Sequence, residues 1–65
     1  MLLRQLRLEA GLHQAELARR LGKPQSFVSR YEAGERRLDL IELRQVCQAL
    51  GSSLVSLVEH FEREL

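Results

Sequence analysis

The sequence has 65 residues, of which 45% are hydrophobic and 29% charged, and its formal net charge is +1. A chain of this length buries only about 60% of the surface that it exposes when unfolded, so we expect one domain over residues 1–65. Its apolar runs are a few residues long, which argues against a membrane span and predicts a cytoplasmic protein. The single cysteine, Cys47, has no partner for an internal disulfide, in agreement with a reducing compartment.

Five short helices are predicted and no strand, because apolar residues recur at helical spacing and no alternating run or hairpin turn is present. The expected fold class is therefore all-α. The helices are expected at about residues 2–10, 14–21, 24–32, 40–50 and 54–64. Gly11, Gly22 and Gly51 follow three of these helices, where glycine commonly ends a helix.

Start signals precede four helices, and the last of them is the N-cap that Ser52-Ser53 offer to helix 54–64. His13 precedes helix 14–21 with Glu16 at the capping-box position, although His is a poorer cap than Ser or Thr. Pro24 suits the first turn of helix 24–32, where its missing N–H is not needed. Asp39 and Glu42 form the pattern of a capping box at the start of helix 40–50.

The last two helices each carry an apolar stripe. In helix 40–50 the stripe holds Leu40, Leu43, Val46, Cys47 and Leu50. In helix 54–64 and the residue after it, the stripe holds Leu54, Leu57, Val58, Phe61 and Leu65. The second stripe is long for so small a body, so we expect its end to form an exposed patch or a dimer seam.

Residues 24–32 have an apolar side and an opposite polar side. Val28 and Tyr31 share the apolar side at 100° per residue, and Phe27 lies at its flank, where it either closes the core or touches a thymine methyl. The polar side holds Gln25, Ser26, Ser29 and Arg30. A solvated face more often carries Glu and Lys, whereas Gln and Arg can pair bidentately with adenine and guanine in a major groove. The pattern favours a helix that reads bases; an ordinary amphipathic surface helix is the alternative.

The charges agree with an anionic polymer near this helix. Residues 1–37 hold eight Lys and Arg against four acids, whereas residues 38–65 hold two against five. The basic side chains that flank residues 24–32, or lie within them, are Arg19, Arg20, Lys23, Arg30, Arg36 and Arg37. The acidic C-terminal part is expected to face away from such a polymer.

Helix 14–21, the glycine turn and helix 24–32 together read as a helix-turn-helix. The block Gln-Ala-Glu-Leu-Ala-Arg-Arg-Leu-Gly at 14–22, followed by Gln-Ser-Phe-Val-Ser-Arg-Tyr-Glu-Ala-Gly at 25–34, resembles the Cro/C1-type (Xre) family of bacterial and phage transcription regulators. The similarity runs from about Leu3 to Leu57 and includes Gly11-Leu12 and Ala49-Leu50-Gly51. It implies a five-helix lambda-repressor-like domain that binds double-stranded DNA.

The resemblance also implies roles for single residues. Base contacts are implied for Gln25, Ser26 and Arg30. Phosphate contacts are implied for Gln14, Arg36 and Arg37, and Lys23 and Ser29 are further candidates for a phosphate. The family pairs an arginine of the first helix with a glutamate at the end of the third, which implies an ion pair between Arg7 and Glu32. Three positions depart from the family pattern, namely His13, Lys23 and Pro24, where Ser or Thr caps or an apolar residue are more usual.

No pattern of residues indicates an enzyme, a cofactor or a metal site. The sequence has no nucleophile and base arrangement and no phosphate-cradling glycine loop. His13 and His60 stand far apart, outside any metal-ligand spacing. Cys47 lies in an apolar stripe, where cysteine usually behaves as a small hydrophobic residue.

Two functions follow as hypotheses. The first is a sequence-specific regulator, in its simplest form a repressor, that binds an inverted-repeat operator as a homodimer with recognition helices about 34 Å apart. The candidate dimer interface is Leu54, Val55, Val58, Phe61 and Leu65. The second is a protein-interaction module that uses the same apolar edge, such as the antitoxin of a toxin–antitoxin pair or a restriction-modification controller. DNA affinity that falls steeply with salt would favour the first hypothesis.

Overall fold

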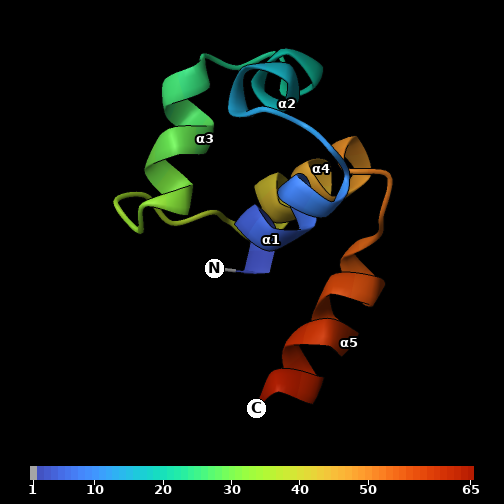
Figure 1. The fold of residues 1–65 in the computed structure, drawn as a ribbon. Helices are drawn as coiled ribbons and strands as arrows, with labels where there is room; N and C mark the ends of the chain where they lie inside the picture. Colours follow the sequence, from blue (N-terminus) through green and yellow to red (C-terminus); the bar gives the residue numbers. More distant parts are fainter. Residues whose placement is uncertain (1) are drawn as a thin grey trace.

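In a computed structural model, which describes residues 2–65, the chain forms five α-helices (Figure 1). They are α1 (Leu2–Glu9), α2 (Gln14–Leu21), α3 (Gln25–Glu32), α4 (Leu40–Ala49) and α5 (Leu54–Glu64). The predicted all-α fold is confirmed, and each helix begins and ends within one residue of its expected bounds. None of the helices in the described part of the chain is long and apolar enough to cross a membrane.

The capping signals of α4 work as the sequence predicts. Asp39 Oδ1 accepts a hydrogen bond from the backbone N–H of Glu42 at 2.7 Å, and Glu42 Oε1 accepts one from the backbone N–H of Asp39 at 3.0 Å. At α2 the N–H of His13 donates to Glu16 Oε1 at a longer distance of 3.4 Å. The expectation for Pro24 was wrong by one residue: its ψ of 153° is extended, so it is the N-cap of α3 and lies before the first turn.

Two glycines set the ends of the helix-turn-helix. Gly22 after α2 and Gly34 after α3 have φ angles of 67° and 76°, a left-handed conformation in which other residues are strained. Each allows a bond that closes the preceding helix, from Lys23 N–H to the carbonyl of Ala18 at 3.0 Å in the first case. The chain therefore leaves α2 abruptly and reaches α3 after only three residues.

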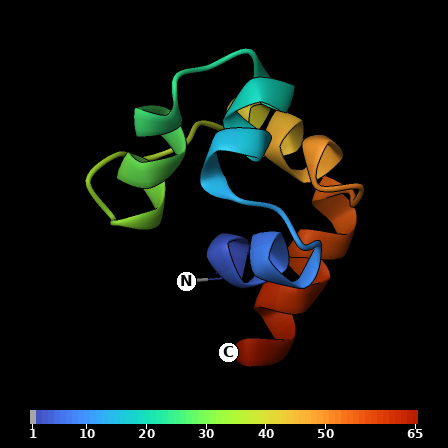
Figure 2. The same ribbon diagram turned by 45° about the horizontal axis from the view of Figure 1, so that its top comes forward.

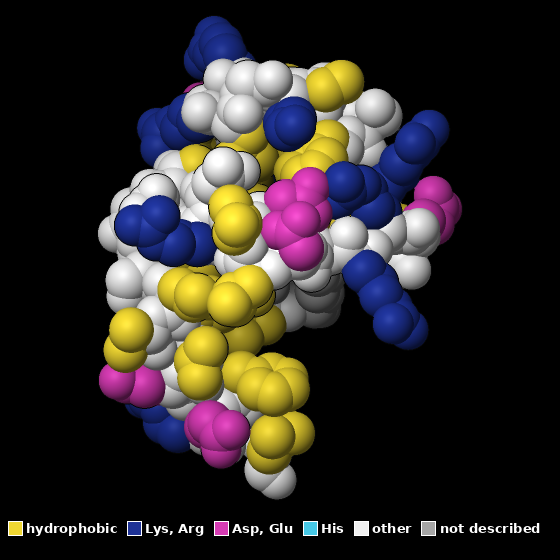
Figure 3. Space-filling model, turned by 180° about the vertical axis from the view of Figure 1, so that it is seen from behind, with side chains coloured by type: hydrophobic (Ala, Val, Ile, Leu, Met, Phe, Trp, Pro, Cys, Tyr) yellow, Lys and Arg dark blue, Asp and Glu magenta, His cyan; other side chains and the backbone are white. Residues whose placement is uncertain are grey.

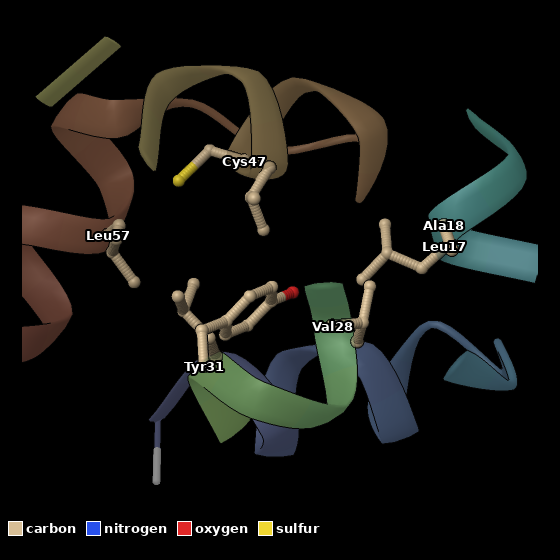
Figure 4. Packing of buried hydrophobic residues seen from close by; sticks show 8 residues of the cluster. Leu17, Ala18, Val28, Tyr31, Cys47 and Leu57 are labelled. Atoms are coloured by element: carbon tan, nitrogen blue, oxygen red, sulfur yellow. The ribbon is translucent and has the colours of Figure 1, made fainter. Parts of the chain in front are cut away.

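The core lies where the five helices meet, and Leu3 is the contribution of α1. Helix α2 packs against α3 and α4, and α4 packs against α5. The largest fully buried side chains are Leu17, Val28, Tyr31, Val46 and Cys47, most of which are labelled in Figure 4. Leu40, the first residue of the apolar stripe predicted for α4, is 68% exposed. Leu40 is the first residue of α4, and the other helices do not cover this N-terminal end of the helix.

The Tyr31 hydroxyl provides a direct test of this core. Tyr31 is 1% exposed, and among residues 2–65 its hydroxyl has no hydrogen-bond partner. A buried hydroxyl without a partner costs about 1–3 kcal/mol. Tyr31→Phe removes only that oxygen and keeps the edge-to-face contact with the Phe27 ring, whose centroid lies 5.7 Å away. We therefore expect Tyr31→Phe to raise the free energy of unfolding in urea titrations; a lower value would show that the hydroxyl makes a favourable bond.

Candidate nucleic-acid interface

Helix α3 stands at the edge of the molecule with one side buried and the other exposed (Figure 2). Val28 and Tyr31 are 0% and 1% exposed and hold the helix to the core. The exposed residues of the opposite side are Gln25, Ser26, Ser29 and Arg30. This is the division that the sequence predicts, and none of these four exposed side chains is acidic. The surface offers amide, hydroxyl and guanidinium groups that can donate hydrogen bonds.

Basic side chains flank α3 at both ends. Lys23 lies in the turn before the helix, and Arg36 and Arg37 lie in the loop after it; all three are exposed. In Figure 3, seen from behind, Lys and Arg side chains gather over the upper part and the right side of the molecule. Hydrophobic side chains gather over the lower part, where α5 lies (Figure 3). On this face, most of the Lys and Arg side chains therefore lie apart from the apolar surface around α5.

Phe27 connects the two basic segments to the core. The side chain is half-buried, and its ring meets Tyr31 edge to face at an interplanar angle of 76°. Lys23 Nζ lies 5.7 Å from the ring centroid, and Arg36 Cζ lies 4.7 Å from it. Cations at these distances are attracted to the aromatic face. The ring therefore packs against the core, and it also supports the two basic side chains; its contact with a thymine methyl stays a prediction.

Arg7 and Glu32 form the ion pair that the family resemblance implies. Arg7 Nε donates to Glu32 Oε2 at 2.8 Å, and Arg7 Nη2 donates to Glu32 Oε1 at 3.0 Å. Arg7 Nη1 donates to the carbonyl of Leu12 at 2.8 Å. The two side chains are only 7% and 3% exposed. Burial alone would raise the pKa of Glu32, but hydrogen bonds from Arg7 and Gln14, and the charges of Arg7 and Arg4, hold that pKa below its ordinary value.

Two of the residues expected to contact phosphates, Gln14 and Arg36, form hydrogen bonds with other side chains of the protein. Gln14 Nε2 donates to Glu32 Oε1 at 3.0 Å, so this amide ties α2 to the end of α3. Arg36 donates to Glu42 through both terminal nitrogens. Sequence analysis missed both bonds, because nothing in the spacing of these residues marks them as partners. Their phosphate contacts, like those of Lys23, Ser29 and Arg37, stay predictions.

Helix α5 and the residue after it carry four exposed large apolar side chains. Val55, Val58, Phe61 and Leu65 are 68%, 48%, 53% and 85% exposed. Leu54, also expected at a dimer interface, is half-buried and packs against the core, and its part in a dimer interface stays a prediction. Beside the surface runs a groove of about 400 Å³, lined by Leu2, Leu3, Leu43, Leu57, Val58 and Phe61. We refer to Val55, Val58, Phe61 and Leu65 as the α5 face.

Cys47 lies in the core, as expected for a small hydrophobic residue. It is 0% exposed, and burial raises the pKa of its thiol. A raised pKa suppresses the thiolate that redox chemistry and metal binding require. Cys47 therefore belongs to the packing of α4.

Comparisons with known proteins agree with the helix-turn-helix fold. The helix-turn-helix family matches residues 3–57. The uncharacterized HTH-type transcriptional regulator y4dJ of Sinorhizobium fredii is 45% identical over 53 residues, which cover 82% of this chain and 69% of that protein.

Two solved structures have the same fold. An XRE-family like protein from Pseudomonas syringae pv. tomato superposes with a TM-score of 0.90 at 48% identity, covering 97% of this chain and 77% of that one. A mutant of the restriction-modification controller protein C.Esp1396I superposes with a TM-score of 0.88 at 29% identity, covering 95% and 78%. The chain therefore belongs to the Cro/C1-type (Xre) helix-turn-helix family and is a DNA-binding transcriptional regulator.

Proposed function

We propose that this regulator binds an inverted-repeat operator as a homodimer, with α3 of each copy in a major groove. The observation that carries the proposal is the exposed polar face of α3, flanked by basic residues at both ends. A helix in the major groove presents its exposed face to base edges, while its two ends come near the phosphates of the groove walls. The distribution of charge and hydrogen-bonding groups on α3 matches that arrangement.

In this proposal the residues on and around α3 make two kinds of contact, with bases and with phosphates. Gln25, Ser26 and Arg30 are the base contacts, because a Gln can bond adenine N6/N7 and an Arg can bond guanine O6/N7 bidentately. Ser29 and Lys23 contact phosphates, as do Arg36 and Arg37 in the following loop. Gln14 contacts a phosphate with the part of its amide that Glu32 leaves free, aided by the N-terminus of α2.

The α5 face is the proposed dimer interface. It lies on α5, which stands on the other side of the fold from α3 (Figure 1). A two-fold axis through this face would bring the same four apolar residues of each copy together, which is the isologous contact of a symmetric dimer. The acidic residues of α5, Glu59, Glu62 and Glu64, outnumber its single Arg63, so the DNA backbone repels this helix and favours its pairing away from the duplex.

A binding selection from random duplex DNA, with the protein's mass in solution measured alongside, tests the proposal. An enriched inverted repeat with half-sites one helical turn apart, bound by a dimer, is the expected result. A folded protein that enriches no sequence would reject operator recognition. A stable complex with a different protein through the α5 face would instead favour the interaction module.

Phe61→Lys is expected to turn the dimer into a monomer and to weaken operator binding. Phe61 is 53% exposed, so the change places a charge in the proposed interface without opening the core. Leu8→Lys is a matched control, because Leu8 is 54% exposed on α1 and lies outside the α5 face. Mass measurements over a concentration series read out the dimer. Equal behaviour of the two variants would place the dimer contact elsewhere.

A further inference from the structure

Arg36 is held by its neighbours at the border of the proposed DNA surface. Nη2 donates to Glu42 Oε2 at 2.9 Å, and Nη1 donates to Glu42 Oε1 at 3.3 Å. Nη1 also donates to the carbonyl of Arg37 at 3.3 Å. One face of the guanidinium lies against the Phe27 ring, 4.7 Å from its centroid. The side chain nevertheless stays 39% exposed.

These contacts leave one edge of the guanidinium unused. A guanidinium has five N–H groups in a rigid plane. The N–H groups of Nη1 donate to Glu42 and to the Arg37 carbonyl, and one N–H of Nη2 donates to Glu42. The Nε–H and the second Nη2–H remain, and among residues 2–65 the structure shows no acceptor for either. These two N–H groups are parallel on the same edge, an arrangement that suits two oxygens of one phosphate.

Glu42 is itself fixed by the start of α4. Its Oε1 accepts the N–H of Asp39 at 3.0 Å, and its own backbone N–H donates to Asp39 Oδ1 at 2.7 Å. The hydrogen bond from Arg36 is the main reason that the pKa of Glu42 lies below its ordinary value, so the side chain is a carboxylate at neutral pH. The orientation of Arg36 is therefore tied to the capping box of α4.

We propose that Glu42 is a positioning residue for DNA binding, which orients Arg36 so that its free edge receives a backbone phosphate bidentately. The inference rests on the proposed function, in which Arg36 contacts DNA. A long exposed side chain normally loses rotamer freedom when it binds. Because Glu42 and Phe27 already hold Arg36, that loss occurs on folding and not on binding.

Whether DNA affinity rises or falls when Glu42 is neutralised distinguishes a positioning role from a purely electrostatic one. Glu42 is a negative charge near a surface that meets phosphates, so its neutralisation should strengthen DNA binding if charge alone matters. If Glu42 positions Arg36, its neutralisation should weaken binding. The substitution Glu42→Gln keeps a side chain that serves in a capping box, so the start of α4 is retained.

The experiment measures the affinity of the full chain for its selected operator and for random duplex DNA at several salt concentrations. We expect Glu42→Gln to weaken both by about 2- to 10-fold, the range of one net hydrogen bond, because a phosphate contact carries no sequence information. Glu35→Gln, which neutralises an exposed acid of the same loop, is the matched control and should bind as well as the wild type or better. In an Arg36→Gln background, Glu42→Gln should no longer weaken binding.

A second variant keeps the test decisive if Glu42→Gln unfolds in thermal denaturation. Arg36→Lys keeps the charge but lacks the fork, so it should lose affinity while the slope of affinity against salt stays the same. Arg37→Ala should lower that slope by about one charge. The positioning role alone is rejected if Arg37→Ala lowers the slope as expected while Glu42→Gln binds as tightly as Glu35→Gln. Where Glu42→Gln is unfolded, wild-type affinity of Arg36→Lys rejects this role. If no operator is enriched and Arg37→Ala leaves the slope unchanged, the proposed function itself fails.

Discussion

Arg7→Met is expected to destabilise the fold by about 3–5 kcal/mol, because it leaves the buried carboxylate of Glu32 without its cation. Both side chains of the pair are less than a tenth exposed, so water cannot replace the lost partner. A folded domain of this size has a total stability of only about 3–10 kcal/mol. The variant should therefore be partly or wholly unfolded at room temperature. Urea titration followed by far-UV circular dichroism measures the change.

The matched control is Arg4→Met in the same helix. Arg4 is exposed, so its loss should change the free energy of unfolding by no more than about 0.5 kcal/mol. The double variant Arg7→Met with Glu32→Leu should recover much of the stability, because removing both charges removes the cost of burying either. If Arg7→Met costs no more than Arg4→Met, the pair does not hold the fold together.

Gln25→Ala and Arg30→Ala should each weaken binding to the selected operator by about 1–3 kcal/mol and relax the preference at one base position. Both side chains are exposed on α3, so the changes leave the core and the Arg7–Glu32 pair untouched. Binding to random duplex DNA should change much less, since bases are not read there. Competition titrations with operators changed at one base pair at a time measure the relaxed preference.

Arg19→Ala is the control for the loss of positive charge. Arg19 is exposed on α2, outside the polar face of α3, so its removal should affect operator and random DNA alike. Equal losses on the two DNAs for Arg30→Ala would mean that Arg30 only positions the protein. If Gln25→Ala also loses equal affinity for the two DNAs, Gln25 only positions the protein. Base recognition would then depend on Ser26 or on DNA shape.

Glu32 links the stability of the fold to the presentation of α3. It is the last residue of α3 and accepts hydrogen bonds from Arg7 on α1 and from Gln14 on α2. One carboxylate therefore joins three helices at the end of the proposed recognition helix. Because of this link, variants at Arg7 or Glu32 should lose DNA binding mainly through unfolding, whereas variants at Gln25 or Arg30 should lose it while folded.

The local features of this protein could be predicted from its sequence. The bounds of the five helices and the division of α3 into a buried and an exposed side are present in the structure as expected. The same holds for the capping box of Asp39 and Glu42. These features depend on residues within a few positions of one another, so helical periodicity and capping chemistry are sufficient to determine them. The Arg7–Glu32 pair spans the chain and was expected only through the family resemblance.

The contacts between separate elements were decided by the tertiary structure alone. Arg36 bonds Glu42, Gln14 bonds Glu32, and Leu40 is exposed at the end of α4 although it continues an apolar stripe. Leu54 packs inward, which leaves the α5 face to Val55, Val58, Phe61 and Leu65. Periodicity assigns a side chain to a face of its helix but does not say which neighbour covers that face. Which side chains meet depends on how the helices pack and on where their ends fall in three dimensions.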